Sequence, residues 1–240
     1  MTIRILLVDD HRIVRSGIAA LLQKERDFEL VAEAENGQEA VRLARQLRPD
    51  VLLMDVAMPG MNGIEAMRRI HADEPAAKCL CLSVHNDNRM VLGVIDAGAM
   101  GYLMKDCSFD ELARAIRSVM SNQIYLSTEL VGIVVEKYRN RNARVAPDPF
   151  SLLTPREREM VQLFSEGYST GRIAGKLCVS AKTVATHRQH ILKKLGIGGI
   201  AELTRYAIRE GLSTLDAPTA AAASAARAPS ARGRPPAKAA

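Results

Sequence analysis

The sequence has no long hydrophobic run, few aromatic residues and only 4 cysteines among 240 residues. No apolar stretch approaches the roughly 18 residues that a membrane-spanning helix needs, and the first residues enter a strand-like pattern without the layout of a signal peptide. Cys79 and Cys81 lie two apart in a strand-like run, while Cys107 and Cys178 are isolated, so the spacing of a zinc or redox site is lacking. These absences predict a cytoplasmic protein, without membrane attachment, whose cysteines serve packing.

Acidic residues are scarce in the back half of the chain. The net charge is +6, yet residues 1–125 carry more Asp and Glu than Lys and Arg, whereas residues 151–212 carry twice as many basic as acidic residues. The length and the 48% hydrophobic content suit two ordinary globular domains. The asymmetry suggests that the basic half meets a polyanion, although charge alone does not separate nucleic acid from a solvated surface.

Apolar strand-like runs alternate with amphipathic helical segments through the front half. The helical segments place their apolar residues mainly three and four apart. Strict alternation predicts an α/β domain with a parallel sheet, helices on both faces, and all loops that follow the strands along one edge. The strands are expected at residues 3–8, 28–34, 51–54, 79–84 and 101–104, and the helices at residues 13–22, 37–47, 63–71, 90–97 and 109–120.

Polar residues stand where these strands end. Asp9 and Asp10 follow the first run, Asp55 follows the third, Ser83 lies in the fourth near its end, and Lys105 follows the fifth. Open α/β sheets bind ligands at the carboxyl ends of their strands, so we expect these side chains to share one crevice. Three carboxylates there need a cation, and an all-oxygen set suits Mg²⁺ together with a phosphoryl group. For Asp55 taken alone, a helix cap remains an equally good interpretation.

A family resemblance rests on several motifs of this half. They are Val8-Asp9-Asp10-His11, Asp55 with Met58-Pro59-Gly60-Met61-Asn62-Gly63, Ser83, and Gly98-Ala99-Met100-Gly101-Tyr102-Leu103-Met104-Lys105-Asp106. Together they resemble the receiver domain of two-component response regulators. The resemblance implies a flavodoxin-like, parallel five-stranded sheet of order 2-1-3-4-5.

The resemblance also implies a phosphorylation site. Asp55 would accept a phosphoryl group from a sensor histidine kinase. Asp10, Asp55 and the Ala57 carbonyl would hold Mg²⁺ directly, and Asp9 would assist through a water molecule. His11 follows the acid pair, and we expect it only to open the first helix, because a hard metal in an oxygen site does not favour imidazole.

Three further residues complete the implied site. Lys105 would bind the phosphoryl group, and Ser83 and Tyr102 would form the switch pair that responds to it. A phosphoryl group adds roughly −1.5 to −2 charge and three acceptor oxygens, enough to draw Ser83 inward and free a space for Tyr102.

The remaining sequence divides the chain into segments. A short amphipathic pattern at residues 127–137 and a polar stretch at residues 138–149 indicate a linker. The Ala/Pro/Arg-rich end has the composition of a disordered tail. We therefore expect a receiver-like domain at residues 1–125, a linker with a short helix at 126–149, a helical domain at 150–212 and a tail at 213–240.

The helical domain shows the pattern of a helix-turn-helix. Thr154, Pro155 and Glu157 supply an N-cap, a first-turn proline and a capping box. Helices are expected at residues 155–167, 170–177, 181–195 and 200–210. The third is basic, without an acidic residue from Ser180 to Leu195, which favours DNA over a mixed solvated surface. Its outward face would carry Lys182, Thr183, Ala185, Thr186, Arg188, Gln189 and Lys193.

A second resemblance rests on motifs of this domain. They are Leu153-Thr154-Pro155-Arg156-Glu157, Ile173-Ala174, Ser180 through Val184, His187, Ile191 and Lys194-Leu195. They resemble the LuxR-type helix-turn-helix, and the two halves together resemble a NarL/FixJ-family response regulator. The resemblance implies binding to double-stranded promoter DNA as a homodimer through the last helix. The dimer residues would be Ile200, Leu203, Thr204, Ala207 and Ile208.

These features predict a transcription regulator gated by phosphorylation, and not an enzyme. The alternative is a DNA-binding regulator whose receiver responds to a partner or ligand instead of phosphate. A third class, an Mg²⁺-dependent phosphatase or phosphotransferase acting on metabolites, would leave the basic helical domain unexplained.

Overall fold

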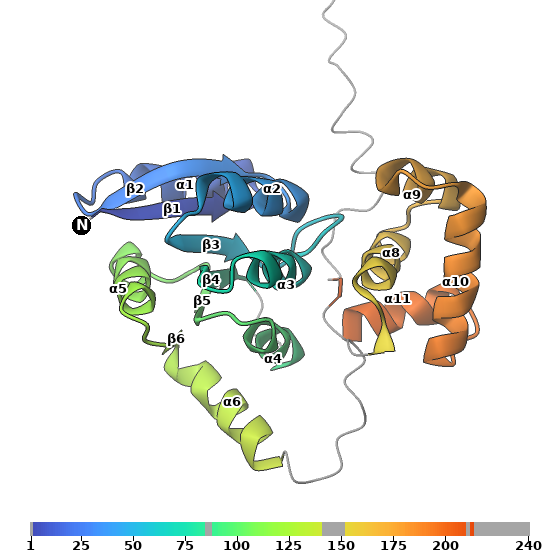
Figure 1. Cartoon of the computed structure of the whole chain (residues 1–240). Helices are drawn as coiled ribbons and strands as arrows, with labels where there is room; N and C mark the ends of the chain where they lie inside the picture. Colours follow the sequence, from blue (N-terminus) through green and yellow to red (C-terminus); the bar gives the residue numbers. More distant parts are fainter. Residues whose placement is uncertain (1, 85–87, 141–151, 210–211, 214–240) are drawn as a thin grey trace, which may run out of the picture.

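The computed structural model describes residues 2–84, 88–140, 152–209 and 212–213 (Figure 1). The polar linker stretch beyond residue 140 and nearly all of the predicted tail lie outside the described residues. Strands and helices alternate through the N-terminal domain, defined here as residues 2–140. Its elements are β1 (Ile3–Val8), α1 (Arg12–Leu22), β2 (Phe28–Ala34), α2 (Gly37–Leu47), β3 (Val51–Asp55), α3 (Gly63–Asp73), β4 (Lys78–Ser83), α4 (Asn88–Asp96), β5 (Gly101–Met104), α5 (Phe109–Met120), β6 (Tyr125–Leu126) and α6 (Thr128–Asn140).

The described strands form one parallel sheet of order β2-β1-β3-β4-β5-β6. The predicted order 2-1-3-4-5 is confirmed, and β6 is an additional strand that pairs with the outer edge of β5. A strand of two residues has no alternation that a sequence could reveal. Gly101 makes room for it, because a Cβ there would lie 2.9 Å from the Tyr125 carbonyl oxygen and 2.6 Å from Leu80 Cδ1.

Helices cover both faces of the sheet. Leu7 and Leu53 share a core with α1 and α5 on one face, through side chains such as Ile116. Leu52 and other residues of the opposite face pack against α2, α3 and α4, through side chains such as Ile64. Apolar side chains therefore cover both faces of the sheet, and polar side chains can gather only at the edge where the strands end.

The helix expected at residues 127–137 is present as α6 and runs on to Asn140. It contacts α4, and its Leu130 is 1% exposed within the core on that face. The start of the expected linker is therefore packed against the sheet domain. No helix among the described residues is both long enough and apolar enough to span a bilayer.

The C-terminal domain, residues 152–213, is helical. The predicted capping box is confirmed: the Thr154 hydroxyl accepts from the Glu157 N–H at 3.3 Å, and the Glu157 carboxylate accepts from the Thr154 N–H at 2.9 Å. Gly196 ends the third helix with φ of 64°, a left-handed conformation that glycine adopts at little cost. The helices are α8 (Pro155–Ser165), α9 (Thr170–Leu177), α10 (Ala181–Leu195) and α11 (Ile200–Arg209).

The two domains meet through α8. Arg158 Nε lies 3.0 Å from Glu65 Oε2, and Arg69 Nη2 lies 3.1 Å from Glu159 Oε2, so two ion pairs cross from α3 to α8. Figure 1 shows α8 beside the loop between β3 and α3, with α10 on the far side of the C-terminal domain. This docking therefore leaves the third helix of the domain facing away from the sheet.

Candidate functional site

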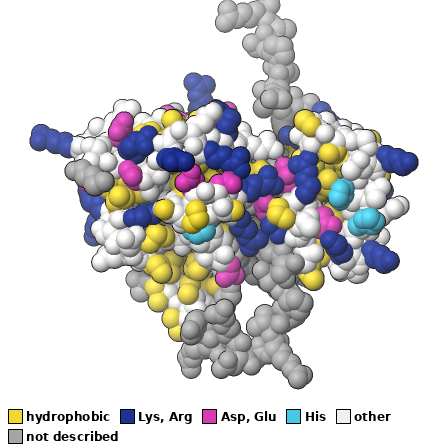
Figure 2. Space-filling view, in the orientation of Figure 1, with side chains coloured by type: hydrophobic (Ala, Val, Ile, Leu, Met, Phe, Trp, Pro, Cys, Tyr) yellow, Lys and Arg dark blue, Asp and Glu magenta, His cyan; other side chains and the backbone are white. Residues whose placement is uncertain are grey.

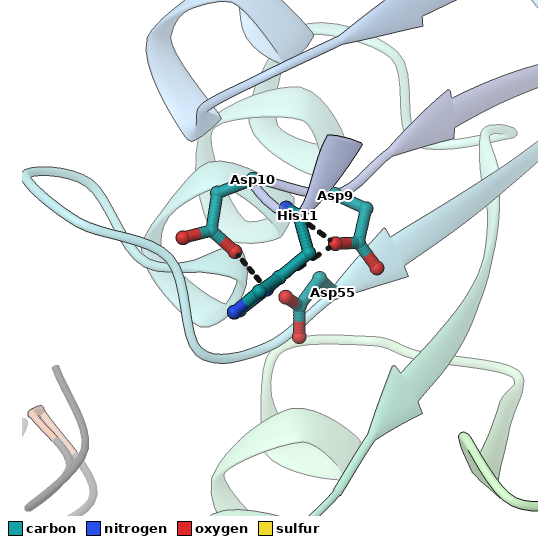
Figure 3. Close-up of side chains that lie close together, drawn as sticks. All are labelled: Asp9, Asp10, His11 and Asp55. Atoms are coloured by element: carbon teal, nitrogen blue, oxygen red, sulfur yellow. Dashed lines mark hydrogen bonds and ion pairs between the residues drawn. The ribbon is translucent and has the colours of Figure 1, made fainter. Parts of the chain in front are cut away.

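The carboxyl ends of β1 and β3 bring three carboxylates together. Asp9 and Asp10 follow β1, and Asp55 is the last residue of β3. With the His11 imidazole, each offers one ligand atom, and these four atoms all lie within 4.8 Å of one another. Figure 3 shows the four side chains gathered at this edge of the sheet. The acid crevice expected from the sequence is therefore a single cluster.

Lys105 joins this cluster from the end of β5. Its Nζ lies 2.7 Å from Asp9 Oδ2 and 2.8 Å from Asp55 Oδ2. Both carboxylates are buried, Asp9 fully and Asp55 with 2% exposure. One ammonium faces three carboxylates, counting Asp10, so the pocket retains an excess of negative charge.

Burial and charge together set the ionisation of this pair. Burial raises the pKa of Asp55 to about 6, although the Lys105 ammonium opposes part of the rise. Burial also disfavours the ammonium of Lys105, but the neighbouring Asp55 and Asp9 carboxylates outweigh this and raise its pKa. Near neutral pH, Asp55 is therefore mostly a carboxylate paired with a charged lysine.

The donor set fits a hard divalent cation. His11 Nδ1 lies 2.8 Å from Asp10 Oδ1, and Lys105 Nζ lies 2.7 Å from Asp9 Oδ2. Each carboxylate has two oxygens with several lone pairs, so these contacts leave acceptor sites for coordination. Mg²⁺ prefers oxygen ligands from one or two carboxylates, so the residues present fit this ion.

The outer side of the C-terminal domain presents the basic helix α10. Val184 and Ile191 are fully buried and fix the helix on the domain core. The Ser180 hydroxyl caps its start by accepting from the Thr183 N–H at 3.0 Å. Figure 2 shows Lys, Arg and His side chains on this outer side. Of the predicted DNA-contact set, Lys182, Thr183, Thr186, Gln189 and Lys193 are exposed, and Ala185 and Arg188 are half-buried.

Comparison with known proteins matches both halves of the chain. Residues 5–117 match the family described as response regulator receiver domain, and residues 151–207 match the luxR family of bacterial regulatory proteins. The oxygen regulatory protein NreC of Staphylococcus aureus is 37% identical over 213 residues, which cover 87% of this chain and 98% of that protein. The chain belongs to the NarL/FixJ family of response regulators. It is thus a phosphorylatable transcription regulator that binds DNA.

Solved structures of response regulators share this architecture. A LuxR-family two-component response regulator from Aurantimonas sp. SI85-9A1 matches with a TM-score of 0.55 and 37% identity, covering 58% of this chain and 99% of that one. RcsB from Salmonella enterica serovar Typhimurium, solved bound to promoter P1flhDC with the phosphomimetic BeF3-, matches with a TM-score of 0.57 over 89% of this chain and 100% of that one. At 24% identity, the second likeness concerns the fold alone.

In this response regulator, the loop after β3 lies close against Asp55. The Ala57 N–H donates to Asp55 Oδ1 at 3.1 Å. A Cβ on Gly63 would clash with the Asp55 carbonyl oxygen, so only glycine allows α3 to start this close to the strand. Asn62 caps α3 by accepting from the Glu65 N–H at 2.8 Å. The Pro-Gly and Asn-Gly cluster of the sequence therefore brings the loop back beside the carboxylate.

The expected switch pair, Ser83 and Tyr102, lies on adjacent strands of the receiver. Both residues are fully buried. Ser83 Oγ lies 3.8 Å from Met90 Sδ, and Tyr102 packs in the core that Met90 of α4 also enters. Both side chains are thus placed between the sheet and α4.

The sequence does not predict the contacts that two basic residues make beside the acid cluster. His11, expected only to open α1, has its Nδ1 close to both acids, 2.8 Å from Asp10 Oδ1 and 3.6 Å from Asp9 Oδ1. Arg15 is 6% exposed and donates from Nη1 to the Asp9 carbonyl oxygen at 2.6 Å. It also pairs with Glu33 and Glu35 at the end of β2. Arg15 lies four residues after His11, the N-cap residue of α1, so the two residues share one side of the helix start, but this spacing does not reveal their partners.

Two of the five residues predicted for the dimer contact are buried within the single chain. Leu203 and Ala207 are fully buried in the core of the C-terminal domain, because α11 packs against α8. Ile200 is 37% exposed, and Thr204 and Ile208 are partly exposed. Of the five predicted dimer residues, these last three are available at the surface of α11 for contact with a second chain.

Proposed function

We propose that this response regulator accepts a phosphoryl group on Asp55 from a sensor histidine kinase, and that the modification controls how it binds double-stranded promoter DNA as a homodimer. The observation that carries the proposal is the convergence of Asp9, Asp10, Asp55 and Lys105 in one cluster at the carboxyl ends of the receiver's strands. We further propose that it acts in the cytoplasm as a regulator and not as an enzyme on a metabolite.

Asp55 has the properties of a nucleophile in this pocket. Its carboxylate is ionised above about pH 6, since burial raises its pKa to about 6. The carboxylate attacks the phosphorus of a phosphohistidine, the P–N bond breaks, and the histidine nitrogen leaves with a proton. Lys105 Nζ, 2.8 Å from Asp55 Oδ2, is placed to bind an oxygen of the transferred group.

The metal role falls to the acids and the adjoining backbone. Asp10, Asp55 and the Ala57 carbonyl would hold Mg²⁺, with Asp9 assisting through a water molecule. Bound there, the ion would neutralise charge on the incoming phosphoryl oxygens. The N–H of Ala57 already bonds to the Asp55 carboxylate, which keeps this residue beside the acid cluster.

The response to the phosphoryl group is assigned to Ser83 and Tyr102. The new group adds roughly −1.5 to −2 charge beside Ser83, whose hydroxyl can donate to it. A movement of Ser83 frees space between the sheet and α4, the layer in which Tyr102 packs. The affected surface is therefore the one that α4, β5 and α5 form.

DNA reading is assigned to α10. Its exposed Gln189 suits an adenine edge, its Thr side chains suit thymine methyl groups, and its basic residues suit phosphates. Helix α11 would pair two chains through Ile200, Thr204 and Ile208. We place the receiver at residues 1–125, the linker at 126–149, the DNA-binding domain at 150–212 and the tail at 213–240.

The alternative is a receiver controlled by a partner or ligand instead of phosphate. Labelling of the full chain with acetyl phosphate or with a cognate kinase separates the two. Asp55→Asn should abolish labelling, and Asp50→Asn, at a carboxylate that bonds the Arg4 backbone outside the pocket, should leave it intact. An unlabelled wild-type chain, or full labelling of Asp55→Asn, would remove Asp55 from its role.

A further inference from the structure

Residues 56–62, here called the acceptor loop, connect Asp55 to α3. Backbone hydrogen bonds anchor its two ends: Val56 N–H donates to the Leu82 carbonyl at 3.3 Å, and Gly63 N–H donates to the Val56 carbonyl at 3.0 Å. The middle of the loop finds partners outside the receiver. These partners are Gln162 of α8, Glu166 at the C-cap of α8, and the Leu212 carbonyl oxygen, which accepts from Asn62 Nδ2 at 3.2 Å. The DNA-binding domain therefore takes part in holding the loop.

Gln162 bonds two backbone groups of the acceptor loop. Its Nε2 donates to the Met58 carbonyl oxygen at 2.8 Å, and its Oε1 accepts from the Asn62 N–H at 3.1 Å. The side chain is 3% exposed. One amide thus bridges the loop in both senses, as donor and as acceptor.

Glu166, one helical turn further on, bonds a third group. Its carboxylate accepts from the Gly60 N–H at 3.0 and 3.3 Å, and also from Gln162 Nε2 at 2.8 Å. It is 2% exposed. Gly60 sits at the turn of the loop with φ of 82°. The three bonded groups, Met58 O, Gly60 N and Asn62 N, all follow Ala57 within five residues.

We infer that Gln162 and Glu166 are positioning residues for the metal site of the receiver, acting from the DNA-binding domain. This inference rests on the proposed function, in which the Ala57 carbonyl is a metal ligand. When the backbone groups of the loop are hydrogen-bonded in one conformation, the Ala57 carbonyl stays in place. Binding the ion then costs less conformational entropy, because the loop is already ordered. Without the two side chains, water takes over these bonds and the loop samples more conformations.

A purely adhesive role for the same contacts makes a different prediction. Gln38 of α2 also crosses the domain boundary, with Nε2 3.3 Å from Glu159 Oε1, but it does not touch the acceptor loop. If α8 merely attaches the domains, loss of Gln38 and loss of Gln162 should have similar consequences. If Gln162 positions the loop, only loss of Gln162 should weaken Mg²⁺ binding.

The test is titration of Mg²⁺ alone into the full chain by isothermal calorimetry. We expect Gln162→Ala to raise the Kd for Mg²⁺ by about tenfold, the lower end of what loss of a supporting hydrogen bond costs a metal site. Gln38→Ala, the matched control, should bind Mg²⁺ as the wild type does. Glu166→Ala should also weaken binding, and Glu166→Gln, which keeps an acceptor for the Gly60 N–H, should restore most of the affinity.

Phosphoryl labelling supplies a second measurement. In Gln162→Ala, the Mg²⁺ concentration for half-maximal labelling should rise by the same factor, while the rate at saturating Mg²⁺ should match that of the wild type. A folding defect would instead lower the rate at every Mg²⁺ concentration. If Gln162→Ala does not fold, the Glu166 pair of variants makes the same test.

The outcomes separate this inference from the proposed function. Equal or tighter Mg²⁺ binding in Gln162→Ala and Glu166→Ala would overturn the positioning role, even with wild-type labelling at Asp55. Equal weakening in Gln38→Ala would overturn it too, because adhesion would then explain the effect. Absence of labelling in the wild-type chain would instead overturn the proposed function.

Discussion

Lys105 Nζ lies 2.8 Å from Asp55 Oδ2, and the same ammonium lies 2.7 Å from Asp9. The lysine therefore already occupies the position from which it can neutralise charge on a group attached to Asp55. It also lowers the cost of burying that carboxylate, although burial still raises the pKa of Asp55 to about 6. The pairing of Lys105 with Asp55 therefore affects both the phosphorylation chemistry and the stability of the fold.

Lys105→Met should impair phosphorylation. Loss of the ammonium removes the charge opposed to the phosphoryl oxygens and raises the pKa of Asp55 further, so we expect the labelling rate to fall by about a hundredfold. The measurement is the initial rate of acetyl phosphate labelling. Lys78→Met is the matched control, because Lys78 Nζ bonds the Met120 carbonyl outside the pocket. A wild-type rate in Lys105→Met would contradict the assignment.

Asp55→Asn should stabilise the metal-free chain in a pH-dependent way. The folded-state pKa of Asp55 is raised from 3.8 to about 6, so the unfolded chain binds fewer protons between these values and stability from this group falls as pH rises through them. The Asn side chain of the variant does not ionise, so this fall in stability with pH is absent. The variant's advantage in the free energy of unfolding should grow from about 0.5 kcal/mol at about pH 4 to about 3 kcal/mol at about pH 7. Urea unfolding with chelator present measures it, and a constant difference across pH would refute it.

The ion pair between Arg158 and Glu65 should hold the domains together. Both side chains are buried, and their pairing at 3.0 Å spans the boundary. Arg158→Ala should enlarge the radius of gyration measured by small-angle X-ray scattering. It should lower the free energy of unfolding by about 2 kcal/mol, less than for a buried charge left unpaired, because Glu65 keeps Arg69 as a partner. Arg42→Ala, which removes an exposed pair within α2, should change neither quantity.

Two substitutions on α10 should have different consequences for DNA binding. Arg188→Ala should weaken binding to all sequences and reduce the slope of log K against log salt by about 1, if it contacts a phosphate. Gln189→Ala should relax the preference for one base pair and leave the salt slope unchanged. Competition assays with randomised sites at several salt concentrations give both quantities. Unchanged binding by both variants would discredit α10 as the reading helix.

Residues of α11 should divide into surface and core classes. Ile200→Asp should weaken dimerisation, as measured by analytical ultracentrifugation, without unfolding the domain, because Ile200 is 37% exposed. Leu203→Ala should instead lower the free energy of unfolding by about 2–5 kcal/mol, since it empties a fully buried site. A stable Leu203→Ala variant with impaired dimerisation would reverse this division.

The sequence predicts much of the fold because local signals agree with one another. Residues 170–177 and 181–195 are helices with the predicted bounds. Their periodicity indicates a helix in each case, and serine caps and Gly196 mark where these helices begin and end. Asp9, Asp10, Asp55 and Lys105 could be placed together because parallel strands end at one edge. Here local pattern and topology were sufficient.

Features that depend on tertiary contacts were not predictable. Strand β6 exists only by pairing with β5, and Arg15 is buried only because Glu33 and Glu35 approach it from β2. The burial of Leu203 and the contacts of Gln162 with the acceptor loop likewise depend on how separate elements pack. Periodicity identifies the apolar side of α11, but it does not say whether that side meets α8 or a second chain.

Location of the phosphoryl group tests the central claim most directly. The full chain is labelled with acetyl phosphate and Mg²⁺, reduced with borohydride so that an aspartyl phosphate becomes homoserine, and digested for tandem mass spectrometry. The account predicts homoserine at position 55, and an unmodified chain in Asp55→Asn. Modification at any other carboxylate, with position 55 unchanged, would contradict it.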